Sequence, residues 1–385
     1  MERWAKANPD HRVTYVISGS NPARVAAFVQ QRGLDRNVLE IRADPDGAVA
    51  DAHGVQSTPT LLLTDANGVL QSRHTRIDQL VQPVADSGRE LGTSYDLVVY
   101  VPGAEEGRAR AALATARTEC RRLEALLSEW RDDSLVSRIN RTASTTSVPV
   151  PPMLRRLLEA SLHVSRVTDS AFDITWPSLA GSARDVVVND GGIRFGDPQT
   201  RIGLGGVAKG LVVDALFAVL RRAGFGDVVV NIGGDLRTSG GARRLRIADP
   251  FAKGRVAAHL VVRDTAVASS GNYLRPNHIV DPRTGSPPAF GGSVTVLTRD
   301  AAMADALATA LFVMGPQKGL AFAKATAGVE AVFVTRQGVL SSPGVRPIVH
   351  PAQLSLIDVG VDLGGHDVGV TQEYLHDSQV RSAEQ

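Results

Sequence analysis

The chain has 385 residues, with 42 lysines and arginines against 40 aspartates and glutamates, and 43% of its residues are apolar. This balance excludes a basic field for nucleic acid and an acidic tail, and the length suits about two or three domains. A single cysteine, Cys120, excludes an internal disulfide framework and a cysteine-based metal site. No stretch reaches the ~20 apolar residues of a spanning helix, and the polar opening MERWAKANPD is not typical of a signal peptide.

Residues 1–80 alternate strand and helix patterns. The patterns predict strands at 13–17, 38–42, 60–64 and 69–72 and helices at 20–31 and 48–53. The segment AHGVQSTPTLLLTDANGVL resembles the second half of a thioredoxin-like domain, with Pro59 where that fold has a cis proline. The Cys-x-x-Cys pair of such domains would precede this segment, and this chain has none, so we expect no dithiol chemistry. Either an upstream start is missing, or the domain is an interaction module.

The next elements open a second domain. Small and polar residues at 81–90 predict a linker, and the alternating pattern of Thr93–Val101 predicts a strand. Helices are predicted at 105–129, with Cys120 in the core, and at 151–168, with His163 at the surface. Between them, SEWRDDSLVSRIN places Trp130 in a polar loop, where it either stacks on a flat ring or caps the helix. AFDITWPSL then predicts a buried Phe172 and a turn at Asp173.

A glycine pair, Gly205 and Gly206, precedes a helix predicted at 207–222 and a buried strand at 227–232. Such a turn brings backbone close to a ligand, and the first N–H groups of the helix then face an anion such as a phosphate. Lys209 opposes the usual preference for acids in a first helical turn, so we expect a ligand to supply negative charge there. The alternative is a glycine cap beside a solvated lysine.

The segment DAAMADALATALFVM, residues 300–314, predicts a buried helix, because Asp305 and Thr309 are its only polar residues after Asp300. These two residues are spaced i, i+4 and therefore share one face. A buried carboxylate needs a partner, which is either a hard cation such as Mg²⁺ or a buried lysine or arginine. The alternative for Thr309 is a hydrogen bond to its own helix.

Eight motifs occur in the order and spacing of the ApbE family of FAD:protein FMN transferases, and the resemblance covers about residues 88–345. They are LGTSY, SEWRDDSLVSRIN, AFDIT, LGGVAKG, VNIGGD, SSGNY, NHIVDPRTG and DALATALFVMG. The resemblance implies an α+β enzyme domain at 91–346, preceded by the thioredoxin-like domain and followed by a tail at 347–385. It implies an enzyme that cleaves FAD with Mg²⁺, releases AMP and attaches FMN to a Thr or Ser of an acceptor flavoprotein.

The resemblance also implies roles for individual residues. Mg²⁺ would be held by the carbonyl of Ala208 and the side chains of Asp305 and Thr309, and Asp305 and His278 would be catalytic, His278 as the general base. FAD would contact Leu91, Trp130, Ala171, Phe172, Asp173, Gly205, Lys209, Leu211 and Ile279.

Some positions depart from the family pattern. Gly203 stands where the family usually has an aspartate, Leu91 where it has methionine, Trp130 where it has tyrosine, and Leu211 where it has an aromatic residue. The sequence therefore leaves three functions open: a transferase, an FAD-binding scaffold without turnover, and a pyrophosphatase that yields FMN and AMP. We expect a cytoplasmic protein if the chain is complete, and a cell-envelope protein if an upstream start is missing.

Overall fold

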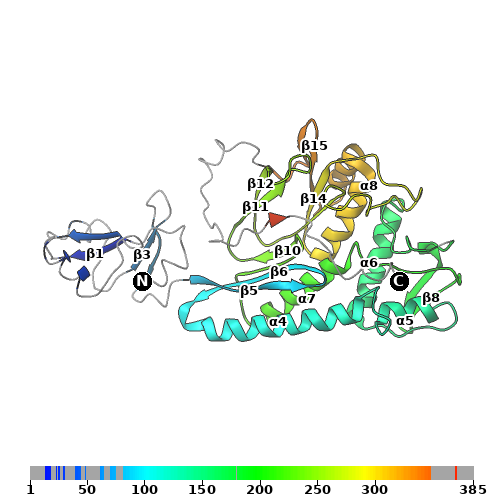
Figure 1. The fold of residues 1–385 in the computed structure, drawn as a ribbon, viewed down its shortest axis with the longest axis horizontal. Helices are drawn as coiled ribbons and strands as arrows, with labels where there is room; N and C mark the ends of the chain where they lie inside the picture. Colours follow the sequence, from blue (N-terminus) through cyan, green and yellow to red (C-terminus); the bar gives the residue numbers. More distant parts are fainter. Residues whose placement is uncertain are drawn as a thin grey trace, which may run out of the picture. The chain divides into compact units, whose positions relative to one another are not determined.

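The structure is a computed structural model that describes residues 81–178 and 180–347 (Figure 1). Shorter described stretches are 14–18, 23, 25–26, 29–30, 40–44, 48, 61–64, 70–74 and 369–370. The chain divides into two compact units. The first comprises residues 1–84, 100–110 and 356–367, and the second comprises 85–99, 111–355 and 368–385.

The first unit contains the four strands predicted near the start of the chain. Strand β1, Thr14–Ser18, pairs in parallel with β2, Glu40–Asp44. Strand β3, Leu61–Thr64, pairs antiparallel with β4, Leu70–His74. Pro59 and most of the two predicted helices lie outside the described residues. The thioredoxin-like likeness therefore stays a prediction.

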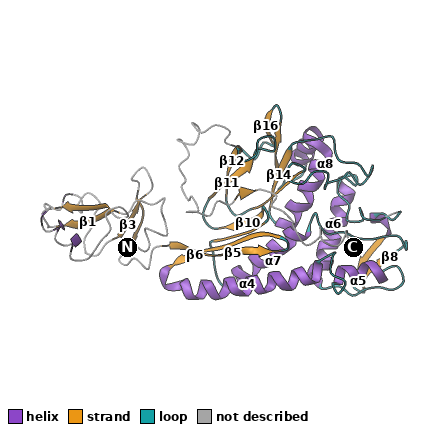
Figure 2. Cartoon of the chain, in the orientation of Figure 1, coloured by secondary structure: helices purple, strands orange, loops and turns teal. Residues whose placement is uncertain are grey.

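An eight-stranded sheet, in the order β16-β15-β14-β13-β10-β9-β6-β5, forms the centre of the second unit (Figure 2). The pairs from β16 through β6 are antiparallel, which confirms the α+β class. Strand β9 is buried at every position, as its apolar run predicts. The strands are β5 (Val81–Glu90), β6 (Thr93–Pro102), β9 (Val228–Ile232), β10 (Asp235–Ser239), β13 (Ala266–Gly271), β14 (Ser293–Thr298), β15 (Glu330–Thr335) and β16 (Gly338–Ser341).

The prediction of a linker at 81–90 is wrong, because this segment forms strand β5 at the edge of the sheet. Leu91 and Gly92, with φ of 55° and 69°, form the two-residue turn into β6. Such left-handed pairs suit tight hairpins. An edge strand has one side open to solvent, so it tolerates the small and polar residues that resemble a linker.

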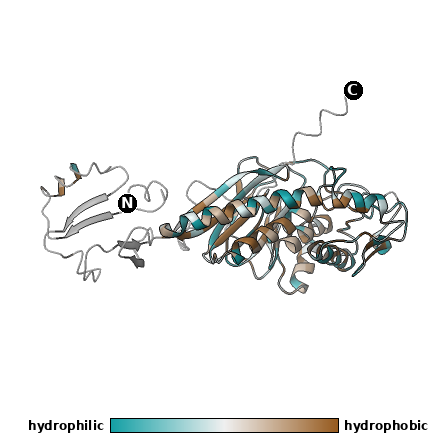
Figure 3. Cartoon of the chain, turned by 90° about the horizontal axis from the view of Figure 1, so that it is seen from below, coloured by the Kyte–Doolittle hydropathy of each residue, from teal (hydrophilic) through white to brown (hydrophobic). Residues whose placement is uncertain are grey.

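The long helices follow their sequence patterns. They are α4 (Glu106–Leu127), α5 (Leu135–Thr142), α6 (Pro152–Val167) and α7 (Ala208–Arg222). Cys120 on α4 is only 2% exposed, and His163 on α6 is exposed, as predicted. Figure 3 shows hydrophilic and hydrophobic residues interspersed along α4, as expected of a helix with one buried side.

Helix α8 spans Ala301–Ala325 and packs against β13, β14 and α7. The side chain of Asp300 caps its start by accepting a hydrogen bond from the N–H of Met303 at 3.0 Å. Gly315, with φ of 75°, and Pro316 interrupt the helix where the apolar pattern ends. Among the described helices α8 alone has the length and hydropathy of a membrane span, although core helices share these properties, and half of its most apolar window is buried.

The remaining elements are short. Strands β11 (Arg243–Ala248) and β12 (Val256–Val262) form a second sheet, and β17 (Gly369–Val370) pairs with β11 in parallel. Strand β17 lies in the tail after residue 347, and the rest of that tail lies outside the described residues. The others are β7 (Val186–Asn189), β8 (Gly192–Phe195), η2 (Gly103–Glu105) and η3 (Ala183–Asp185).

Candidate functional site

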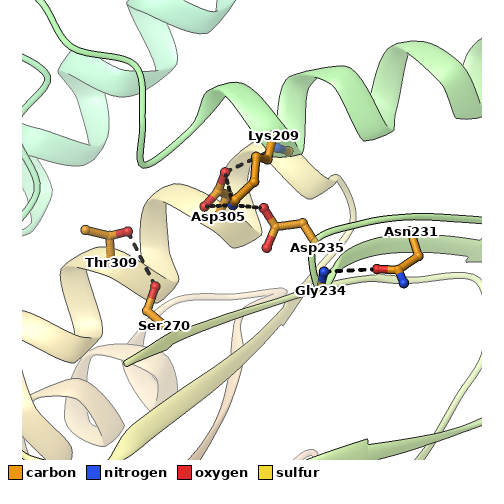
Figure 4. Close-up of polar contacts among 8 residues, drawn as sticks. Lys209, Asn231, Gly234, Asp235, Ser270, Asp305 and Thr309 are labelled. Atoms are coloured by element: carbon orange, nitrogen blue, oxygen red, sulfur yellow. Dashed lines mark hydrogen bonds and ion pairs between the residues drawn. The ribbon is translucent and has the colours of Figure 1, made fainter. Parts of the chain in front are cut away.

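Three charged residues meet where α7 begins, beside α8 and the β9–β10 turn. Lys209 reaches from the first turn of α7 to the carboxylate of Asp235, and its Nζ lies 3.4 Å from Oδ1 of Asp305 (Figure 4). Asp235 and Asp305 are 1% and 4% exposed. The negative charge that we expected from a ligand is thus supplied by two carboxylates of the chain.

The two carboxylates keep Lys209 charged. Burial by itself would lower the pKa of Lys209, but the charges of Asp235 and Asp305 outweigh it and raise the pKa. One lysine faces two carboxylates, so an excess negative charge remains if all three groups are ionised. That excess favours a further cation or a ligand that brings one.

Asp305 and Thr309 lie on one face of α8, as the i, i+4 spacing predicts. Asp305 Oδ2 accepts a hydrogen bond from the backbone N–H of Gly210 at 3.2 Å. The hydroxyl oxygen of Thr309 lies 3.5 Å from the hydroxyl oxygen of Ser270 on β13. It also faces Gly206, because a Cβ added to Gly206 would lie 3.2 Å from the Thr309 hydroxyl oxygen. Carboxylate and hydroxyl oxygens are ligands that Mg²⁺ accepts, so these residues fit the metal. The described residues contain no group of three acidic, histidine or cysteine side chains that could hold a metal.

In the glycine turn before α7, the backbone N–H of each residue from 201 to 205 donates a hydrogen bond to another part of the chain. The backbone N–H of Arg201 donates to Ser178 Oγ at 2.8 Å. That of Ile202 donates to Asn140 Oδ1 at 2.8 Å, and that of Gly203 donates to the carbonyl of Ile174 at 2.7 Å. The N–H groups of Leu204 and Gly205 donate to the carboxylate of Glu129, the former at 2.5 Å. Partners far away in the sequence therefore position every residue from 201 to 205.

Glu129 follows α4, and its carboxylate accepts from the N–H groups of Leu204 and Gly205, just before α7 begins. Burial raises the pKa of Glu129, and the hydrogen bonds from Leu204 and Gly205 oppose this rise. A side chain at Gly203 would meet Trp176 Nε1, Pro177 Cγ and Glu129 Oε2 at 2.7, 2.9 and 3.1 Å. Gly203 stands where the family usually has an aspartate, and the carboxylate beside this position comes from Glu129 instead.

His278 lies in the loop between β13 and β14. Its Nδ1 lies 2.6 Å from the carbonyl oxygen of Arg275, and because a carbonyl only accepts, Nδ1 carries the proton. Nε2 of the neutral ring is then free to accept a proton. Burial lowers the pKa of His278. The hydrogen bond to the carbonyl of Arg275 opposes this shift, and the charges of Arg275 and Lys209 add to it. The side-chain amide of Asn272 holds the next residue, Ile279, through both its backbone N–H and its carbonyl, at 3.0 and 3.2 Å.

The other predicted ligand contacts differ in accessibility. Trp130 is 72% exposed, whereas Ala171, Phe172, Leu211 and Ile279 are buried and offer little side-chain surface. Asp173 accepts hydrogen bonds from the N–H and hydroxyl of Thr175, which confirms the predicted turn. Leu91 lies in the β5–β6 turn. Thr93, two residues later, lies close to Gly233 of the β9–β10 turn, since a Cβ added to Gly233 would contact the Thr93 side chain. This places Leu91 at the same end of the sheet as Asp235.

Sequence reasoning missed four residues of this site: Glu129, Asn140, Trp176 and Asp235. Asp235 had a usable signal, since a lysine near a buried helix start needs a carboxylate and Asp235 follows a strand that is buried at every position. Glu129 and Asn140 had none, because their partners lie 75 and 62 residues away in the chain.

The ApbE family matches residues 91–184 and 178–333, which hold every site residue above. The chain belongs to the ApbE family. Curated ApbE-family relatives include FAD:protein FMN transferases of Rhodobacter capsulatus and Vibrio cholerae, each 30% identical to this chain. The alignments cover 69% and 62% of this chain and 60% and 84% of the relatives. The chain thus spans less than two thirds of the Rhodobacter relative.

The fold of the chain is also that of solved ApbE structures. The structure of the Pseudomonas stutzeri flavinyl transferase ApbE matches with a TM-score of 0.57 and 26% identity, and the match covers 73% of this chain and 98% of that protein. The ApbE resemblance drawn from the eight motifs is confirmed by the family match and by these relatives.

Proposed function

We propose that this chain is an Mg²⁺-dependent FAD:protein FMN transferase, which moves FMN from FAD to a Thr or Ser hydroxyl of an acceptor flavoprotein and releases AMP. The observation that carries the proposal is the meeting of Asp305, Thr309 and Gly206 at the start of α7. Carboxylate and hydroxyl oxygens there lie beside a glycine turn at which a pyrophosphate can approach the backbone.

The residues have separable roles in this reaction. Asp305, Thr309 and the carbonyl of Ala208 would hold Mg²⁺, which when bound neutralises charge on the pyrophosphate and on the departing AMP. Asp235 binds the ammonium group of Lys209 and thereby reduces its competition for Asp305. The rigid glycine turn positions FAD for in-line attack.

The chemical step needs no nucleophile from the enzyme. The acceptor hydroxyl oxygen forms a bond to the phosphorus of the FMN half, and the bond from that phosphorus to the bridging oxygen breaks and leaves with AMP. His278 Nε2 is free to take the hydroxyl proton, since Nδ1 is occupied by the carbonyl of Arg275.

The test is to incubate the protein with FAD, Mg²⁺ and an acceptor-domain peptide, and to follow AMP release and the covalent flavin fluorescence of the acceptor. We expect Asp305→Asn and Thr309→Val to lose on the order of 10²-fold in rate. Thr115→Val on the exposed face of α4 is the matched control and keeps the rate. AMP release without labelling would favour the pyrophosphatase, and bound FAD without AMP release the scaffold.

A further inference from the structure

A carboxylate on α7 holds the first turn of α8. Oδ1 of Asp214 accepts a hydrogen bond from the backbone N–H of Ala301, and Oδ2 accepts one from the N–H of Ala302, each at 3.0 Å. The first N–H groups of a helix have no partner within it, and the positive end of the helix dipole favours a negative charge there. Asp214 therefore satisfies two of the N–H groups at the start of α8 from a position 87 residues away in the chain.

Asp300, directly before α8, caps the helix in a different way. Its side chain accepts a hydrogen bond from the N–H of Met303 at 3.0 Å, which is the contact of an ordinary N-cap residue. Such a local cap favours the helix but does not orient it relative to another element. The two bonds to Asp214 do orient it, because they fix the start of α8 in relation to α7.

Asp214 is itself held by a cation on the central sheet. Nη1 of Arg237 on β10 donates to Asp214 Oδ1 at 2.6 Å, and both side chains are half-buried. The guanidinium carbon of Arg237 also lies 4.6 Å from the centre of the Phe217 ring, three residues further along α7. Charge-assisted hydrogen bonds away from solvent are short and directional, so Asp214 has little freedom to move.

The same three elements carry the charged cluster of the candidate site. Lys209 of α7 pairs with Asp235 of β10 and with Asp305 of α8. Asp214, five residues later on α7, pairs with Arg237 of β10 and with the start of α8. Two polar contacts of opposite charge order therefore join α7, β10 and α8, and only the first of them includes a predicted metal ligand.

We propose that Asp214 is a positioning residue for the magnesium site, which locks the start of α8 to α7 and thereby fixes Asp305 and Thr309 relative to Ala208. Ala208 is the first residue of α7, whereas Asp305 and Thr309 lie about one and two turns beyond the start of α8. Oxygens from two helices can bind one ion only while the helices keep a fixed relation. Asp214 acts through the backbone of α8 and does not touch the ion. This inference rests on the proposed function, which assigns the metal ligands.

The test measures the binding of Mn²⁺, which electron paramagnetic resonance detects and which stands in for Mg²⁺, to the full chain with FAD and without an acceptor. We expect Asp214→Asn to bind Mn²⁺ about tenfold more weakly than wild type, the usual effect of changing a group that orients metal ligands. Asp227→Asn is the matched control, because it breaks an ion pair with the buried Arg243 and neither residue lies on α7 or α8. It should lose stability but bind Mn²⁺ as wild type does.

A second measurement needs neither metal nor turnover. In the metal-free chain, amide hydrogen exchange at the start of α8 should be faster in Asp214→Asn, because an amide side chain accepts at only one of its two end atoms. Asp227→Asn should exchange there as wild type does. If Asp214→Asn does not fold, Arg237→Gln takes its place, since it removes the cation and leaves the carboxylate. Its effects on Mn²⁺ binding and on exchange should be smaller and in the same direction.

The outcomes separate the two proposals. Equal Mn²⁺ affinity in wild type and the folded variant, or unchanged exchange at the start of α8, overturns the positioning role. Equal losses of Mn²⁺ affinity in Asp214→Asn and Asp227→Asn also overturn it, because the loss would then follow stability alone. Weaker Mn²⁺ binding only in Asp214→Asn, together with a wild-type chain that labels no acceptor, would instead overturn the proposed transfer and leave the positioning role standing.

Discussion

Lys209 balances the charge of the site, because its ammonium group is the cation that Asp235 and Asp305 share. Lys209→Ala leaves Asp235, 1% exposed, as a buried charge without its partner. We expect the free energy of unfolding to fall by about 3–5 kcal/mol, measured by urea titration. Lys253→Ala, at an exposed lysine, should change it little. Lys209→Ala combined with Asp235→Ala should be less destabilised than Lys209→Ala alone, and an equal or larger loss would contradict the pairing.

His278 should set the acidic limb of the pH–rate profile. Burial, aided by the charges of Arg275 and Lys209, lowers its pKa below the ordinary 6.5. The neutral ring is the active base, so the rate should persist at pH 6.5 and fall only as the pH drops through the lowered pKa. His278→Gln should be slow and lack this limb. A rate that is already halved at pH 6.5 would show that the base titrates normally.

The crossing of α7 and α8 brings Lys209 beside Asp305, and Gly210 permits that crossing. A Cβ at Gly210 would strike the carbonyl oxygen of Ala301 and would lie 2.7 Å from the Cα of Ala302. Gly210→Ala should therefore lower the free energy of unfolding by about 1–3 kcal/mol and reduce the transfer rate, because α7 must shift away from Asp305. Gly107→Ala is the matched control, since Gly107 lies in the first turn of α4 with nothing within 4 Å of its Cβ position. Chemical denaturation of both variants checks the expectation, which fails if they are equally stable.

Helix α4 buries the thiol of Cys120 and makes the stability of the fold sensitive to alkali. Burial raises the pKa of Cys120 from 9.0 to about 12. The unfolded chain releases the thiol proton first, so this contribution is complete below pH 9.0 and is lost as the pH rises toward 12. Urea titrations at increasing pH should show a steeper loss for wild type than for Cys120→Ala. Parallel curves would mean that the thiol is not buried.

At the scale of the whole molecule, ligand binding should stabilise the second unit selectively, because all the site residues belong to it. FAD with Mg²⁺ at about 100 times the dissociation constant adds ~2.7 kcal/mol and raises its melting temperature. Chelation of the metal, or Asp305→Asn, should remove most of this shift. A scan of the same chain without FAD serves as the control. A shift that survives both treatments would show that FAD binds without the metal.

The sequence by itself determined the helices α7 and α8, the buried strand β9 and the shared face of Asp305 and Thr309. These features depend on neighbouring residues, through helical spacing, capping and apolar runs, so they can be predicted locally. The motifs also identified the family, because their order along the chain is itself sequence information.

Only the tertiary structure decided that Asp235 is the partner of Lys209, that Glu129 holds the glycine turn, and that residues 81–90 form an edge strand. Each of these depends on how the elements pack together and not on a local sequence pattern. A carboxylate in a loop or a polar edge strand has the same local pattern whether or not it finds such a partner. The partner, and with it the charge balance and shape of the site, exists only once the sheet and helices are packed.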